Sequence, residues 1–154
     1  RNSLLLEPDG IAPSFLEPLA AAARVLSHAA GAAIFKFGDV ARELHFVMEG
    51  RVAIQIPIPG RGPTTVLTVS EGEVFGWSAF VPPHEETATA RAVMPVTLMA
   101  LDGKTLREAC RADMELGLLV SMRLNEVLAS RLWAMRLQLT DLYAAPAERE
   151  PARP

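Results

Sequence analysis

The sequence predicts a mainly β protein, a double-stranded β-helix (a jelly-roll β-roll) with an N-terminal helix and a long C-terminal helix. Three observations support this prediction. Residues 32–102 consist of short runs in which apolar and polar residues alternate, separated by Gly and Pro, as is typical of a β-sandwich or barrel. Residues 103–143 contain no Pro and carry apolar residues at helical spacing. The length of 154 residues, half of them apolar, suits one domain with a sizeable core.

The N-terminal helix is expected over residues 14–27, where Ser14 and Glu17 form the pattern of a capping box and an alanine run favours helix. The strands follow as period-two runs, with a hairpin tip rich in Gly and Pro at residues 58–63. The expected strand runs are residues 33–37, 44–50, 51–58, 64–70, 87–94 and 96–102. Residues 32–102 therefore form the β-roll of a domain that we place at residues 14–143.

Two helices are expected after the roll, a short one over residues 103–111 and a long one over residues 113–143 with Asp113 as its N-cap. At about 1.5 Å per residue the long helix measures roughly 45 Å, which exceeds the width of a small barrel. Its first apolar stripe is expected to lie on the barrel and comprises Leu116, Val120, Leu124, Val127 and Ala134. The Pro-rich, charged residues 144–154 are expected to form a disordered tail.

A second stripe on the long helix has a heptad spacing. It consists of Asn125, Leu128, Leu132, Met135, Leu139 and Leu142. Such a seam, extending beyond the barrel, predicts a parallel homodimer in which a pair of asparagines fixes the register. The alternative is that both stripes are buried within one monomer.

The composition excludes several classes of protein. The net charge of −3 gives no general attraction to nucleic acid or to anionic lipid. The single cysteine, Cys110, excludes a disulfide framework and favours a reducing compartment, so we expect a cytoplasmic protein. No signal-peptide pattern is visible at the start of the sequence. No run approaches the roughly 20 apolar residues that a membrane span needs.

The sequence shows no catalytic or metal-binding pattern. His28, His45 and His84 are isolated in the sequence, so no metal site is expected. Cys110 has no partner in the sequence and is expected to be a buried structural thiol. The sequence contains no nucleophile-elbow, P-loop or dinucleotide-binding motif. We therefore do not expect an enzyme.

The strand region carries a pattern of Gly and apolar positions at fixed spacing. These positions are Gly31, Ile34, Phe35, Gly38, Asp39, Ala41, Leu44, Phe46, Val47, Gly50 and Val52, followed by Gly-Glu-x-Phe-Gly at residues 72–76. The pattern resembles the cyclic nucleotide-binding domain of the catabolite activator and fumarate-nitrate regulator superfamily, over about residues 14–140. The resemblance implies an antiparallel β-roll in which a ligand lies between a phosphate-binding cassette and the long helix. DNA-binding members carry a helix-turn-helix domain after that helix. Only eleven residues follow Tyr143, so we expect no DNA-binding domain in this chain.

The resemblance also places the cassette, which here comprises Phe75, Gly76, Trp77, Ser78, Ala79, Glu86, Thr87 and Ala88. In nucleotide-binding members a glutamate accepts a hydrogen bond from the ribose and an arginine pairs with the phosphate. Trp77 stands where that glutamate is expected, and Glu86 stands where that arginine is expected. Two like charges about 4 Å apart cost about 4 kcal/mol at an effective dielectric constant of 20. The resemblance therefore implies a cyclic-nucleotide pocket, and these two substitutions weaken its affinity for cyclic AMP and cyclic GMP.

Two arginines are candidates for a replacement cation. Arg91 lies on the same strand face as Thr87, and Arg136, next to Met135, lies on the long helix near the expected ligand. The alternative is that both are surface residues whose stems pack on apolar neighbours. Trp77 is expected either to fill the roll or to offer a stacking surface to a flat ligand.

Two functions remain open from the sequence. The first is a dimeric regulatory module that senses a small-molecule effector and reports its binding through the long helix. The second is a dimeric interaction scaffold whose pocket is filled by its own side chains. A ligand that binds only the folded state raises the melting temperature, whereas a filled roll responds to no nucleotide, so a melting measurement separates the two.

Overall fold

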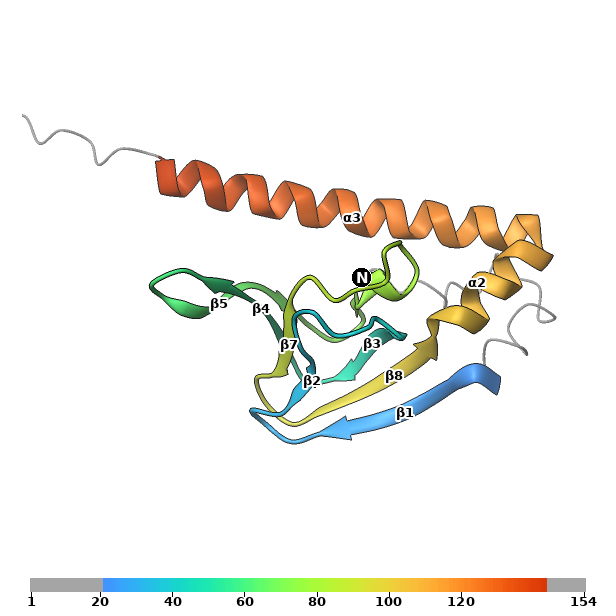
Figure 1. Ribbon diagram of the computed structural model, residues 1–154, viewed down its shortest axis with the longest axis horizontal. Coiled ribbons are helices and arrows are strands. Elements are labelled where there is room, and N and C mark those ends of the chain that lie inside the picture. The colour runs from blue at the N-terminus through green and yellow to red at the C-terminus, as the bar shows by residue number, and fades with distance from the viewer. Residues whose placement is uncertain (1–20, 144–154) are drawn as a thin grey trace, which may run out of the picture.

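The computed structural model describes residues 21–143, with side chains through Asp141. Two four-stranded antiparallel sheets form a β-roll, and two helices follow it (Figure 1). One sheet has the strand order β1-β8-β3-β6 and the other has the order β2-β7-β4-β5. The strands are β1 (Ala23–His28), β2 (Ala33–Phe35), β3 (Glu43–Glu49), β4 (Val52–Ile58), β5 (Gly62–Val69), β6 (Val74–Phe75), β7 (Thr89–Ala92) and β8 (Val96–Asp102). The predicted β-roll is therefore confirmed.

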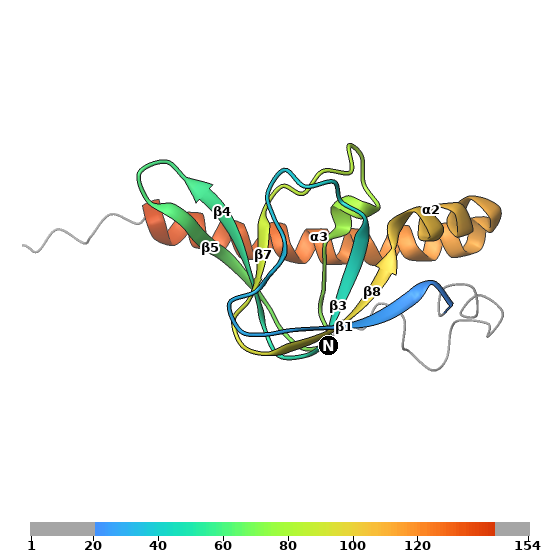
Figure 2. The same ribbon diagram turned by 60° about the horizontal axis from the view of Figure 1, so that its bottom comes forward.

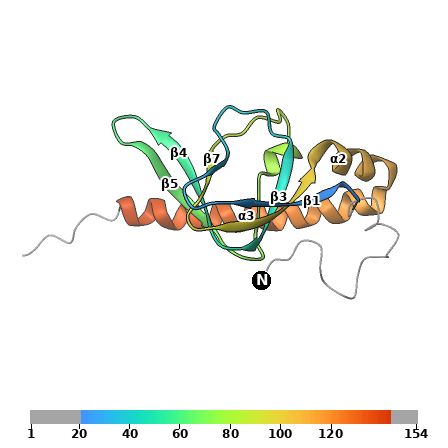
Figure 3. The ribbon, with the colours of Figure 1, turned by 90° about the horizontal axis from the view of Figure 1, so that it is seen from below.

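The helices are η1 (Trp77–Ala79), a single 3-10 turn between β6 and β7, then α2 (Gly103–Ala112) and α3 (Met114–Tyr143). Helix α3 runs across the whole roll, and its C-terminal half extends toward the end where the β4–β5 hairpin projects (Figures 1 and 3). Seen from the side that Figure 2 brings forward, strands β1, β3 and β8 lie in front of α3. The predicted helix boundaries agree with α2 and α3 to within a residue.

The N-terminal helix predicted over residues 14–27 is wrong from Ala23 onward. Ala21 and Ala22 have a helical backbone, but β1 begins at Ala23 and pairs with β8 along its whole length. Residues 14–20 lie outside the described part of the chain. Backbone pairing with β8 outweighs the helix propensity of the alanines, which is a weak preference that tertiary contacts override. An exposed ion pair between Arg24 Nη2 and Glu43 Oε1, 2.6 Å long, accompanies this packing.

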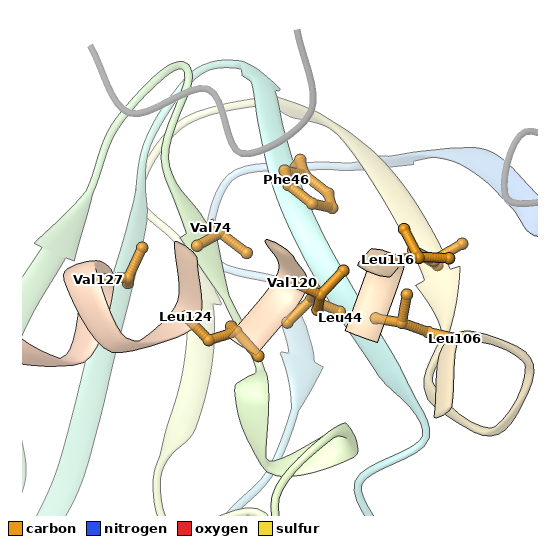
Figure 4. Packing of buried hydrophobic residues seen from close by; sticks show 9 residues of the cluster. Leu44, Phe46, Val74, Leu106, Leu116, Val120, Leu124 and Val127 are labelled. Carbon is orange, nitrogen blue, oxygen red and sulfur yellow. The ribbon is translucent and has the colours of Figure 1, made fainter. Parts of the chain in front are cut away.

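The core consists of two apolar clusters. One lies inside the roll between the two sheets and comprises Val47, Val52, Val69, Phe75, Ala90, Ala92, Val96 and Leu98. The other joins the roll to α2 and α3 and comprises Leu44, Phe46, Val74, Leu101, Leu106, Leu116, Val120, Leu124 and Val127 (Figure 4). Burying one such aliphatic side chain contributes about 1.5–3 kcal/mol. The predicted stripe on α3 is therefore confirmed for its first four members, while Ala134 is half-buried.

Side-chain caps fix the start of each helix. The Thr105 amide donates to Asp102 Oδ2 over 2.7 Å at the start of α2, and the Leu116 amide donates to Asp113 Oδ1 over 3.0 Å at the start of α3. Capping of this kind satisfies amides that have no partner within the helix. The hydrogen bonds from Thr105 also hold the pKa of Asp102 below its usual range. The predicted capping role of Asp113 is confirmed.

The predicted dimer seam lies mostly on the free surface of α3. Asn125, Leu132, Met135 and Leu139 are exposed, and Leu128 is half-buried. The side chain of Leu142 lies outside the described residues. Most of the seam is therefore free to contact a second copy of the chain. The homodimer stays a prediction.

Candidate functional site

The predicted cassette connects β6 to β7, and Gly76 forms its entry. Gly76 has φ of 78°, in the left-handed region that favours glycine. A Cβ atom there would lie 2.9 Å from the carbonyl oxygen of Glu43 and 3.1 Å from Nδ1 of His45. The backbone of the cassette therefore passes directly against β3, with no room for a side chain.

The short helix η1 packs on α2. Ala79 is fully buried, and a Cβ atom on Gly103 would lie 2.6 Å from the Ala79 carbonyl oxygen. The Arg107 guanidinium donates to the same carbonyl, and His84 Nδ1 lies 3.0 Å from the Ser78 carbonyl oxygen. The cassette is thus in direct backbone contact with α2.

A cavity of ≈ 470 Å³ lies where the cassette meets α2 and α3. Cys110 lines it, is partly buried and packs against the core, and burial raises the pKa of its thiol. The other lining residues are Phe80, Pro82, His84, Arg107, Arg111, Met114, Gly117 and Ser121.

Trp77 packs against the apolar cluster beneath α3. It therefore fills space between the roll and the helix, and this contact tests neither of its two predicted roles. Thr87 is exposed and Ala88 is half-buried. None of these three residues lines the cavity described below.

Three aromatic rings fill part of the roll beside the cassette. Phe75 and His45 stack with their centroids 5.0 Å apart, and Phe35 lies 5.9 Å from each of them. Burial lowers the pKa of His45 to about 4, so the ring is neutral at physiological pH. Its Nδ1 atom is buried and has no hydrogen-bond partner among the described residues.

Glu86 is held in place by its backbone. Its amide donates to the Asp39 carbonyl and its own carbonyl accepts from the Gly38 amide, each over 2.8 Å. The residue is only 4% exposed. Burial, reinforced by the negative charge of Asp39, raises the pKa of the Glu86 carboxyl to about 7. A carboxyl group therefore occupies the position where an arginine was expected, and its raised pKa favours the neutral, protonated form.

Glu86 opens into a cavity of ≈ 390 Å³ between the β2–β3 loop, β3 and the cassette. The lining residues are Ile34, Phe35, Asp39, Val40, Arg42, Glu43, His45 and Glu86. Three of them are carboxylic acids and one is an arginine. Of the predicted site residues only Glu86 lines this cavity, while Phe75 and Gly76 lie close to His45, which does line it.

Sequence reasoning did not assign Arg42, Glu43 or His45 to the site. A signal for two of them was present, because Glu43 and His45 lie two residues apart on β3 and so share one face of a buried strand. In the structure His45 Nε2 lies 3.8 Å from Glu43 Oε2. Two polar residues at that spacing within an otherwise apolar strand indicate that this face of β3 belongs to the site.

The two candidate replacement cations do not line the cavity. Arg91 donates from Nη1 to the Gly31 carbonyl over 2.6 Å and from Nε to Gln55 Oε1 over 3.4 Å. Arg136 is exposed, and its guanidinium carbon lies 5.8 Å from the centroid of the Trp133 ring, in a cation–π contact. Both side chains are therefore engaged elsewhere.

Within the described residues, no three His, Cys, Asp or Glu side chains come together in a way that suits a metal ion. In the same part of the chain, no helix is both long and apolar enough to cross a bilayer.

The β-roll, the cassette between β6 and β7 and the long helix packed on them define a ligand-binding regulatory domain. Residues 25–113, more than half of the chain, match the cyclic nucleotide-binding domain family. The chain belongs to that family, and the predicted resemblance is confirmed.

The chain is similar to two solved structures at 28% identity. One is a cyclic nucleotide-binding protein of Geobacter metallireducens, with a TM-score of 0.72 over 79% of this chain and 88% of that one. The other is the catabolite activator protein of Thermus thermophilus, with a TM-score of 0.69 over 87% of this chain and 61% of that one. Both comparisons agree with the architecture described above.

The chain is also 26% identical, over 113 residues, to a protein of Rhodopseudomonas palustris that is named as a potassium channel. The match covers 73% of this chain and only 26% of the channel protein. The chain thus spans about a quarter of that relative's length.

Proposed function

We propose that this domain is a regulatory ligand-sensing module whose pocket has lost the usual affinity for cyclic AMP and cyclic GMP, and that it is not an enzyme. The observation that supports the proposal is the buried carboxyl of Glu86 at the position where the family resemblance implies an arginine. Asp39 and Glu43 line the same cavity, and Arg42 is the one positively charged side chain among its described lining residues, since His45 is neutral. A cyclic phosphate placed there would meet more negative than positive charge.

The electrostatic repulsion in that arrangement is large compared with the free energy that separates tight from weak binding. Two like charges about 4 Å apart repel by about 4 kcal/mol at an effective dielectric constant of 20. Each 1.4 kcal/mol corresponds to about tenfold in affinity. Ionised Glu86 therefore disfavours a phosphate strongly, and protonated Glu86 offers it one hydrogen bond in place of a bidentate guanidinium.

The readout that we propose is the position of α3. The cassette contacts α2 through Ala79 and Gly103, and α2 leads directly into α3. The exposed heptad seam of α3 supports a homodimer in which a ligand changes the packing of the helices. The single cysteine supports a reducing compartment such as the cytoplasm.

Isothermal titration tests the loss of nucleotide affinity. The wild-type protein is expected to give no binding heat with cyclic AMP or cyclic GMP up to millimolar concentration. Glu86→Arg is expected to gain measurable binding. Micromolar binding by the wild type would refute the proposal, and loss of that binding in Arg136→Ala would assign the phosphate cation to α3.

One observation favours the second function, an interaction scaffold without a ligand. Phe35, His45 and Phe75 stack on one another and fill part of the roll. A scaffold of this kind would keep the same melting temperature with every small molecule offered, whereas a sensor is stabilised by mass action when its ligand is present. A melting screen therefore separates the two functions.

A further inference from the structure

We propose that the cavity between the β2–β3 loop and the cassette binds a small organic cation of the amine or guanidinium class, whose charge lies against Glu86 and Asp39. The inference rests on the proposed function, because it names the class of ligand that the module senses. The argument depends on a carboxyl that faces the cavity without a partner in the described residues, on the charges around it and on the size of the cavity.

The carboxyl of Glu86 has no partner among the described residues. The residue is 4% exposed, yet its side chain accepts no hydrogen bond and forms no ion pair with any residue between 21 and 141. Its backbone hydrogen bonds to Gly38 and Asp39 fix its position at the cavity wall. The described residues do not fully enclose the carboxyl oxygens of Glu86, and the residue lines the cavity, so these oxygens are open to a ligand there. A donor supplied by a ligand would satisfy this group.

The remaining charged and titratable groups of the wall are Asp39 and Arg42 in the β2–β3 loop and Glu43 and His45 on β3. Glu43 is already paired with Arg24 over 2.6 Å. Asp39 accepts from the backbone amide of Lys36 over 2.9 Å, a contact that leaves its charge uncompensated. The uncompensated negative charge of the wall therefore comes from Glu86 and Asp39.

Arg42 does not compensate that charge. Its side chain is exposed and forms no ion pair within the described part of the chain. His45 is buried in a stack of rings, and its low pKa keeps it neutral. Neither basic side chain of the wall thus neutralises Glu86, and the electrostatic environment favours a cation from outside.

The size and the apolar lining fit an organic cation. A cavity of ≈ 390 Å³ lies within the range of about 300–1,000 Å³ that is usual for small-molecule sites. Ile34, Phe35 and Val40 offer apolar surface to a short methylene chain. A guanidinium pairs with carboxylates through two parallel hydrogen bonds, so it matches Glu86 better than a point charge would. A metal ion is not supported, since no set of three ligands gathers among the described residues.

Binding at this position would connect two segments of the regulatory domain. The Glu86 amide already bonds to the Asp39 carbonyl, so a cation held by both carboxyl groups would strengthen an existing link between the β2–β3 loop and the cassette. The cassette in turn contacts α2. The ligand would therefore act on the same elements through which the family resemblance implies that nucleotides act.

The test is isothermal titration of the full chain with agmatine, which carries a guanidinium and an amine. 4-Guanidinobutyrate serves as the probe control, because it has the same guanidinium but a negative tail. The variants are Glu86→Gln, which removes the charge at constant shape, and Asp39→Asn. The matched control is Glu85→Gln, which neutralises the exposed carboxylate one residue earlier. Melting curves establish that each variant is folded.

Agmatine is expected to bind the wild type and Glu85→Gln with equal affinity. Its affinity for Glu86→Gln and for Asp39→Asn is expected to be lower by about tenfold or more. Agmatine is also expected to bind more tightly than 4-guanidinobutyrate. Its binding should release a proton from the Glu86 carboxyl near pH 7, which makes the binding heat depend on the buffer. No binding up to millimolar agmatine, or unchanged binding by both cavity variants, would overturn the inference. Cyclic AMP titrated into the same samples decides the proposed function separately, so the two failures are distinguishable.

Discussion

Arg131 on α3 reaches back to the roll, and its Nη2 atom lies 3.1 Å from Oε1 of Glu73. The arginine side chain is only 13% exposed. The other carboxylate oxygen of Glu73 accepts from the Ser70 amide over 2.7 Å, so the β5–β6 turn and the helix are held by one side chain. This ion pair joins the helix to the roll beyond Val127, the last buried residue of the core cluster on α3.

Replacing Arg131 with Gln is expected to cost about 1 kcal/mol of unfolding free energy, since a partly buried pair contributes more than an exposed one. It should also increase hydrogen exchange in α3 from about Arg131 onward. The control is Arg123→Gln, which removes an exposed ion pair within α3 itself. Equal exchange in both variants would show that the Arg131 contact does not hold the helix.

The raised pKa of Glu86 predicts a pH-dependent stability. Its folded pKa of about 7 lies above the usual value of 4.5, so the folded state holds the proton more tightly, and stability falls as the pH rises through this interval. Above it the penalty amounts to about 3 kcal/mol. Glu86→Gln is therefore expected to be more stable than the wild type near pH 8 and similar to it near pH 4.5. Urea unfolding across this pH range measures the difference, and a difference independent of pH would contradict the prediction.

His45 predicts the opposite trend. Its folded pKa of about 4 lies below the usual value of 6.5, so the unfolded state takes up the proton first, and stability falls as the pH drops through this interval. His45→Phe keeps the ring stack and removes the titration. The variant should therefore gain stability over the wild type as the pH falls from about 6.5 to 4, by about 2–3 kcal/mol at the lower end. Urea midpoints at several pH values provide the check.

Gly76 and Gly72 form a matched pair for backbone substitution. Both have φ near 79°, but a Cβ atom at Gly76 would clash with β3, whereas nothing lies within 4 Å of one at Gly72. Gly72→Ala is expected to cost about 1–2 kcal/mol from the backbone conformation alone. Gly76→Ala should cost clearly more, because β3 and the cassette must move apart. Equal losses in guanidinium unfolding would mean that the close approach at Gly76 is not required.

The proposed homodimer predicts a position-dependent effect on assembly. Leu132 and Leu137 are both exposed on α3, but only Leu132 lies on the face of the heptad seam. Leu132→Asp is expected to give a monomer in sedimentation velocity, since a charge buried in a helical seam lacks a partner. Leu137→Asp should leave the dimer intact. A monomeric wild type, or a dimer that survives Leu132→Asp, would exclude this interface.

The sequence predicted the parts of the fold in which local pattern and tertiary packing agree. The apolar stripe of α3, the capping role of Asp113 and the period-two strands all follow from residue spacing. The prediction of an N-terminal helix was wrong from Ala23 onward. The pairing of β1 with β8 joins segments about seventy residues apart, so it leaves little trace in the local pattern.

The candidate site was predictable only in part. Glu86 was identified from its position in the cassette, but its cavity depends on the β2–β3 loop folding against it through the carbonyl of Asp39. Periodicity shows that Glu43 and His45 share a face, yet it does not show that this face meets Glu86. The engagement of Arg91 with Gly31 likewise depends on a bond between residues far apart in the sequence.

The contact between Ala79 and Gly103 leaves no gap at the junction of cassette and helix. A single methyl group on Gly103 would approach the Ala79 carbonyl oxygen to 2.6 Å, and the Arg107 guanidinium holds that carbonyl from the side. Two bodies packed so closely cannot slide independently, because protein interiors transmit displacement with little compression. A displacement of η1 is therefore expected to shift the first turn of α2 with it.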